Sequence, residues 1–181
     1  MCLCALSSTL QLEADTALKT LSAQQLYEIA VSFINENTYD QAAQVLQLAL
    51  DKEPGNGEYL QLLGSLYVAT DPSYAEKVLY AALDSLGWSR ASSAAIYGNY
   101  IESLRRQGPS RAEDAIAVAL KGAELHGSQL NVLFNAAMTL QFTGRFEDAY
   151  EIYLRVHDIA PYFEEAWERV RKHETRYAFI C

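Results

Sequence analysis

The chain has 181 residues, of which 14 are Lys or Arg and 23 are Asp or Glu, so its formal net charge is −9 at pH 7. Half of the residues are apolar and 11% are aromatic, which is too much packing material for a disordered chain. The negative charge argues against a general binder of phosphate backbones, and the length suffices for one domain or one compact array with a sizeable core.

The three cysteines, Cys2, Cys4 and Cys181, stand at the two ends of the chain, where they cannot cross-link its middle. We therefore expect no disulfide framework and a reducing cytoplasmic or nuclear setting. The first lysine is Lys19, so the apolar start lacks the basic flank of a secretory signal, and no segment is expected to span a membrane. The pair Cys2 and Cys4 leaves two alternatives to frayed terminal residues, an acylation site or half of a metal site.

The pattern along the chain is helical throughout. Nine glycines and four prolines fall between apolar runs of helical period, which is typical of helical hairpins, and no segment alternates as a strand does. Asp71 before Pro72 predicts an N-cap followed by a first-turn proline. Capping boxes are predicted for Ser22 with Gln25, Thr38 with Gln41 and Ser110 with Glu113. The expected helices are 7–20, 23–36, 39–52, 57–69, 72–86, 90–107, 110–125, 129–143, 146–159 and 162–177.

The helix pairs also repeat. One register of small and large apolar residues runs over Leu26, Ile29, Ala30, Phe33, Ala42, Leu46, Ala49 and Pro54. The same register returns over Leu133, Ala136, Ala137, Leu140, Gly144, Ala149, Tyr153, Val156 and Pro161, and two looser copies lie between. The units begin at Ala23, Gly57, Ala94, Leu130 and Glu164, which stand 34, 37, 36 and 34 residues apart. This pattern resembles the tetratricopeptide repeat (TPR), whose signature is W-x2-L-G-x2-Y, then A-x3-F, then P over 34 residues.

The resemblance covers roughly residues 23–175 and implies an all-α fold, a right-handed α-solenoid of about four TPR-like helix hairpins with flanking capping helices. The expected division is listed here in chain order: 1–22 as N-terminal tail and capping helix, 23–161 as the four repeats (approximately 23–56, 57–93, 94–129 and 130–163), and 162–181 as a C-terminal capping helix or half repeat. The last helix could equally be the point where a longer array continues, and apolar end helices would promote self-association.

The motifs of catalytic sites are absent from the sequence: HExxH, GxSxG, a phosphate loop and an EF-hand loop do not occur. Gly55-Asn56-Gly57 is interpreted as a turn. The histidines stand far apart, and His126 and His157 lie near predicted helix C-termini, where they would favour the helix dipole. We therefore expect no enzymatic activity, no cofactor and no metal ion.

The resemblance to the TPR family implies that the first helix of each pair lines a concave groove, in which extended or helical peptides bind. The expected partner-binding residues are Tyr27, Val31, Leu62, Asn99, Glu102, Arg105, Phe134, Asn135 and Met138. Of these, Tyr27, Leu62, Phe134 and Met138 are expected anchors, each with packing on a neighbouring helix as the alternative. Asn99 and Asn135 are expected to hydrogen-bond to a peptide backbone.

Charge in the groove limits the choice of partner. Glu28, Glu58 and Glu102 would give a negative field that favours a basic or neutral peptide. The slots at which TPR co-chaperones hold a C-terminal carboxylate carry no cations here, which excludes that clamp. Arginines at 105, 106 and 111 are interpreted as a solvated face rather than as a nucleic-acid site.

The expected function is a non-enzymatic protein interaction scaffold or adaptor that binds a partner peptide or helix in the groove. The alternative is a substrate-recruiting arm of a larger modifying enzyme, because Asn99 and Asn135 in adjacent units are similar to the groove asparagines of O-GlcNAc transferase-like arrays. In that alternative a catalytic domain would lie beyond Cys181.

Overall fold

The structure is a computed structural model that describes residues 17–178. These residues form helices joined by short connections, with no strand in the described range. The α-helices are α2 (Ala23–Asn35), α3 (Tyr39–Lys52), α4 (Gly57–Tyr67), α5 (Pro72–Leu86), α6 (Ala94–Arg106), α7 (Ala112–Leu125), α8 (Leu130–Phe142), α9 (Phe146–Ile159) and α10 (Glu164–Ala178). Residues 17–20 are the helical end of the first predicted helix. The rest of that helix and the cysteines lie outside the described residues.

Two of the predicted helix starts are confirmed. Ser22 caps α2 through a reciprocal capping box, in which its Oγ accepts from the Gln25 backbone N–H at 3.2 Å and Gln25 Oε1 accepts from the Ser22 N–H at 2.9 Å. Asp71 accepts from the Tyr74 N–H at 3.0 Å, and Pro72 is the first residue of α5. Each cap satisfies a backbone donor that the helix leaves unpaired.

The two other capping boxes were predicted wrongly. The Thr38 hydroxyl donates to the Phe33 carbonyl at 2.9 Å and makes no cap bond with α3. It closes the end of the preceding helix instead, since the turn between α2 and α3 is too short to separate the two ends. Ser110 lies in a short 3-10 helix, η2 (Pro109–Arg111), so α7 begins at Ala112 and has no side-chain cap.

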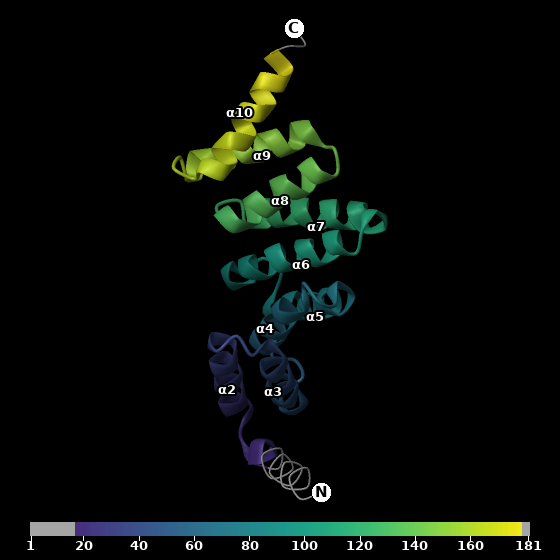
Figure 1. Cartoon of the computed structure of the whole chain (residues 1–181), viewed down its shortest axis with the longest axis vertical. Helices are drawn as coiled ribbons and strands as arrows, with labels where there is room; N and C mark the ends of the chain where they lie inside the picture. Colours follow the sequence, from purple (N-terminus) through teal and green to yellow (C-terminus); the bar gives the residue numbers. More distant parts are fainter. Residues whose placement is uncertain (1–16, 179–181) are drawn as a thin grey trace, which may run out of the picture.

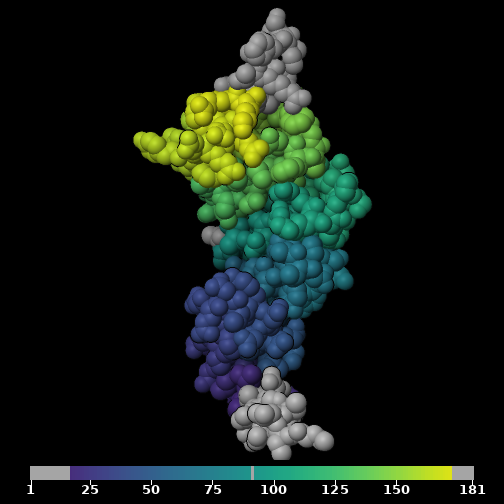
Figure 2. Space-filling model, viewed as in Figure 1, coloured from purple at the N-terminus to yellow at the C-terminus, as the bar shows by residue number. Residues whose placement is uncertain are grey.

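The helices stack in consecutive pairs into one elongated array, with α2 and α10 at opposite ends (Figure 1). Small residues such as Ala30, Ala42 and Ala137 are fully buried between the helices, and large residues such as Leu46 fill the remaining space. Three overlapping apolar clusters follow one another along the array, each built from several successive helices. The apolar core therefore runs along the whole array instead of forming one central cluster. The space-filling view shows successive parts of the array packed against one another (Figure 2).

In the middle of the array, the first helices of successive pairs approach one another more closely than the second helices do. Among the described helices, α4 packs against α6 and α6 against α8, whereas no second helix packs comparably against the next. Gly98 of α6 allows this approach, because a Cβ there would lie 3.0 Å from Asn135 Nδ2 of α8. In a curved stack the closer layer is the inner one, so α4, α6 and α8 line the inner side of the curve.

The two longer connections of the array contain short 3-10 helices, and side-chain bonds tie one of them to a neighbouring helix. The connection before α6 contains the 3-10 helix η1 (Ala91–Ser93), and the one before α7 contains η2. Arg111 of η2 pairs with both oxygens of Glu76 of α5, at 2.6 Å from Nη2 and 2.8 Å from Nη1. Gln107 Nε2 donates to the same carboxylate at 2.8 Å. These bonds hold the second and third pairs together at the turn.

The last helix, α10, packs against α9 with its apolar stripe. Ala166 and Val170 are fully buried there, and Trp167 stacks on His157 with ring centroids 4.6 Å apart. In the described part of the chain, no helix has the length and hydropathy that crossing a bilayer requires.

Candidate functional site

The inner face of the array is built from the partly exposed stripes of α4, α6 and α8, and α2 extends it at one end, where Tyr27 stacks on Tyr59 of α4. The buried side of each helix is fixed by residues such as Leu26, Leu63, Ile101 and Leu133. The predicted partner-binding residues lie on another side, and Tyr27, Val31, Leu62, Asn99 and Met138 are all half-buried there. Periodicity of 3.6 residues brings one such side chain from each turn onto this face.

At the α2 end, Tyr27 and Leu62 line one hollow. The Tyr27 ring stacks on Tyr59 of α4 with a centroid distance of 5.0 Å and an interplanar angle of 25°. Tyr59 is buried, and its hydroxyl donates to Gln24 Oε1 at 3.4 Å. The hollow has a volume of about 400 Å³ and is lined by Tyr27, Glu58, Gln61, Leu62, Leu86 and Ser92. We call it the Tyr27 pocket.

The electrostatic environment of the Tyr27 pocket is negative. Burial, followed by the charges of Glu53 and Glu58, raises the pKa of the Tyr59 phenol that lies against the Tyr27 ring. Glu58 is exposed in the first turn of α4, and Glu28 accepts from Gln24 Nε2 at 3.0 Å. Neither carboxylate forms an ion pair with a described residue. The negative field that the sequence predicts is thus present at this end of the inner face.

In the middle of the face, on α6, the predicted negative charge is cancelled. Glu102 pairs with Arg105 at 3.0 Å and with Arg106 at 2.8 Å. The Arg105 guanidinium also lies over the Phe142 ring of α8, 4.6 Å from its centroid. The prediction of a negative field at Glu102 was therefore wrong, because the two arginines that follow it on the same helix neutralise its carboxylate.

At the α8 end, Phe134 is held by the fold on two sides. Its ring meets Phe163 edge to face at 4.9 Å and Tyr153 at 5.9 Å. The residue is half-buried and packs against the core of the last two pairs. The alternative that the sequence left open, packing on a neighbouring helix, thus accounts for part of its surface.

The two groove asparagines differ in their bonding. Asn135 Nδ2 donates to the Asn131 carbonyl of its own helix at 2.8 Å and covers Gly98. The Asn99 side chain is half-buried and makes no hydrogen bond to any described residue. Asn99 and Asn135 lie on packed helices, so both remain candidates for contacts with a bound backbone.

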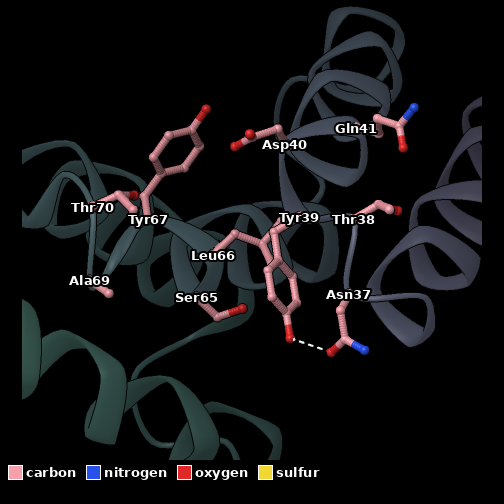
Figure 3. A pocket seen from close by; sticks show the side chains of 11 residues that line it. Asn37, Thr38, Tyr39, Asp40, Gln41, Ser65, Leu66, Tyr67, Ala69 and Thr70 are labelled. Carbon is pink, nitrogen blue, oxygen red and sulfur yellow. Dashed lines mark hydrogen bonds between the residues drawn. The ribbon is translucent and has the colours of Figure 1, made fainter.

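Two features were not found from the sequence. One is a larger hollow of about 660 Å³ at the edge of the array, between the start of α3 and the end of α4 (Figure 3). Tyr39, Leu66 and Tyr67 supply apolar surface there, and the Tyr39 hydroxyl donates to Asn37 Oδ1 at 2.8 Å. Its lining comes from two turns and two helix ends, which a search for periodic stripes does not bring together.

The second feature is an aromatic cluster around Trp88, in the connection between α5 and α6. The Trp88 ring packs edge to face against the rings of Tyr80, Tyr97 and Tyr100. Lys121 Nζ lies above the Trp88 ring, 3.8 Å from its centroid. Burial raises the pKa of Tyr97 to about 12. His126 Nε2 lies 2.9 Å from the Trp88 carbonyl, which can only accept, so that nitrogen carries the proton. His126 is therefore a buried structural residue as well as the C-cap of α7.

Several solved structures have the same fold as this chain. A MamA protein shares 18% of its residues with this chain at a TM-score of 0.71, covering 83% of this chain and 80% of that one. YrrB, described as a TPR protein with an unusual peptide-binding site, is 22% identical with a TM-score of 0.70 over 91% and 86%. PilF from Pseudomonas aeruginosa is 16% identical with a TM-score of 0.71 over 86% and 69%.

No protein-family model matches the chain, and no curated protein matches it. Because the sequence identities are low, the similar structures show the fold of this chain and not its function. The chain has the TPR fold, an all-α solenoid of stacked helix pairs, as the sequence predicted.

Proposed function

We propose that the chain is a non-enzymatic interaction scaffold that holds a segment of a partner protein against the inner face of α2, α4, α6 and α8. The observation that carries the proposal is the set of half-buried side chains on that face, from Tyr27 to Met138, which combine apolar surface with unpaired polar groups. Such surfaces suit a peptide that contributes both side-chain anchors and backbone hydrogen bonds.

The similar folds support this interaction role. YrrB is described as having a peptide-binding site, and it matches 91% of this chain. Among the described residues, no three His, Cys, Asp or Glu side chains lie close enough together to hold a metal ion. Within the face, Tyr27, Leu62 and Met138 are the proposed anchors, Phe134 offers its uncovered side, and Asn99 with Asn135 bind backbone groups. Val31, Glu102 and Arg105 complete the proposed contacts, in a cytoplasmic or nuclear setting.

The test compares partners captured from native lysate by the wild type and by two inner-face variants, Leu62→Arg and Asn99→Ala with Asn135→Ala. We expect at least tenfold less of the same partner with either variant, because a bulky charge blocks an anchor and the alanines remove two backbone contacts. Leu120→Arg on α7 is the matched control, since Leu120 is an exposed leucine of a second helix. Circular dichroism verifies that all variants stay helical. Equal capture by every variant would place the function on another surface.

A recruiting arm of a larger modifying enzyme is the second candidate. It is favoured by the matching positions of Asn99 and Asn135 on the packed helices α6 and α8. Reading the genomic sequence beyond the codon for Cys181 tests it: an open frame that continues into a catalytic domain supports the arm, and a stop codon in place contradicts it.

A further inference from the structure

The Tyr27 pocket combines three kinds of surface in one hollow. Tyr27 supplies an aromatic ring, Leu62 and Leu86 supply aliphatic walls, and Glu58 supplies a carboxylate at the rim. Gln61 and Ser92 add hydrogen-bonding groups. We propose that this pocket receives an arginine side chain of the bound partner segment, an inference that rests on the proposed function and specifies the chemistry of its partner.

Arginine fits these surfaces better than other side chains. Its planar guanidinium is weakly hydrated and stacks on aromatic rings, and its fork of donors matches a carboxylate. Its methylene stem can lie along Leu62 and Leu86 while the charged end reaches Glu58. A lysine would bring a compact, strongly hydrated ammonium, which loses more by entering a hollow with two leucine walls.

The charge distribution of the inner face selects this pocket for a cation. Glu102 is already neutralised by its own arginines at 3.0 and 2.8 Å, so the middle of the face has no carboxylate to offer. Glu58 and Glu28 have no cationic partner among the described residues, and the whole chain carries a net charge of −9. A basic segment is therefore drawn toward the α2 end of the face.

The molecule uses the same contact within its own fold. The Arg105 guanidinium of α6 lies 4.6 Å from the centroid of the Phe142 ring of α8, so the array already places an arginine of one helix over an aromatic ring of another. The Tyr27 pocket presents an aromatic ring and a carboxylate with which the guanidinium of a partner can make the same kind of contact.

The test begins with a random peptide library displayed on phage and selected on the immobilised wild-type chain. We expect arginine to be enriched at one position of the selected peptides. The best peptide is then synthesised with a fluorophore in two forms, one with arginine and one with citrulline, which has nearly the same shape and no charge. Fluorescence anisotropy should show about tenfold weaker binding of the citrulline peptide to the wild type.

Variants of the pocket decide whether that loss arises there. Glu58→Gln should reduce the penalty for citrulline to less than twofold, and Tyr27→Leu should weaken the arginine peptide severalfold while Tyr27→Phe does not. Glu151→Gln, which removes an exposed carboxylate on α9, is the matched control and should keep the full penalty. Circular dichroism establishes that each variant is folded.

The outcomes separate this inference from the proposed function. Selected peptides without a basic residue, or an equal citrulline penalty on the wild type and Glu58→Gln, would overturn the arginine pocket. If those peptides are still weakened by Asn99→Ala with Asn135→Ala, the inner face remains the binding surface. Peptides insensitive to this double variant and to Leu62→Arg would overturn both.

Discussion

Arg111 and Glu76 illustrate how single residues join distant parts of the array. Their side chains are 30% and 19% exposed, and they connect η2 to α5 across 35 positions of the chain. The hydrogen bond from Arg111 lowers the pKa of Glu76, and Gln107 adds to that effect against the opposing effect of burial. Because the pair is partly buried, loss of one partner leaves a charged group that is incompletely hydrated.

The first prediction concerns this pair. Glu76→Gln should lower the free energy of unfolding by about 2 kcal/mol at pH 7, measured by urea denaturation. Because the pKa of Glu76 is lower in the folded state, its stabilisation is present above the usual value of 4.5 and is lost as the pH falls through the folded pKa. The difference between wild type and variant should therefore close in acid. Glu151→Gln, with an exposed carboxylate, should change stability by less than about 0.5 kcal/mol; a pH-independent difference for Glu76→Gln would contradict the assignment.

At the scale of the element, the α2–α3 and α8–α9 pairs are each closed by a left-handed residue in the turn. Asn37 between α2 and α3 has φ 60°, and Gly144 at the equivalent place between α8 and α9 has φ 84°. In both turns the next backbone N–H bonds back five residues, from Thr38 to Phe33 at 2.9 Å and from Arg145 to Leu140 at 2.8 Å. This ending satisfies the last carbonyls of the first helix and turns the chain back at once.

The second prediction concerns the spacing within a pair. A Cβ at Gly64 of α4 would lie 2.6 Å from Leu79 Cγ and 2.7 Å from its Cδ2, and both residues are buried. Gly64→Ala should therefore destabilise the chain by about 1–3 kcal/mol, despite the better helix propensity of alanine. Gly55→Ala is the matched control, since a Cβ there meets nothing within 4 Å, and should be neutral or slightly stabilising. Thermal and urea denaturation measure both, and a Gly64→Ala chain as stable as the control would mean that α4 and α5 separate at little cost.

At the scale of the whole molecule, stability is distributed along the stack. Each helix pair contacts its neighbours, and the three apolar clusters overlap without one central core. In such arrays the ends can open while distant pairs stay closed. A destabilising substitution in one helix pair should therefore unfold that pair and its neighbours without unfolding distant pairs. In a globular domain of the same size, the same change would affect the whole core.

The third prediction uses this property. Val170 of α10 is fully buried against the α9 side, and Val170→Asp should detach α10 by burying an unpaired charge. Hydrogen exchange followed by mass spectrometry should show faster exchange in α9 and α10 and unchanged protection in α2 to α5. Lys172→Asp, at an exposed position of the same helix, should leave the pattern as in the wild type. Loss of protection along the whole chain would show that the array unfolds as one unit.

The helices and their pairing could be predicted from the sequence. Helix periodicity, Asp71 with Pro72 and the Ser22 capping box act between residues a few positions apart, so their signals can be read locally. The TPR pattern then predicted the solenoid, because stacking is the only way for such pairs to bury their apolar faces. The inner-face positions Tyr27 and Leu62 were predicted in the same way, and the division into four repeats stays a prediction.

Packing between helices determines which of these side chains already have partners within the fold and which carboxylates stay unpaired. Glu102 is neutralised by rotamers of Arg105 and Arg106, Phe134 is shared with Phe163, and Thr38 turns to the preceding helix. Leu86 and Ser92 enter the Tyr27 pocket from the end of a second helix and the connection after it. The physical reason is that pockets and ion pairs depend on distances across the stack, whereas periodicity and capping report only what happens along one helix.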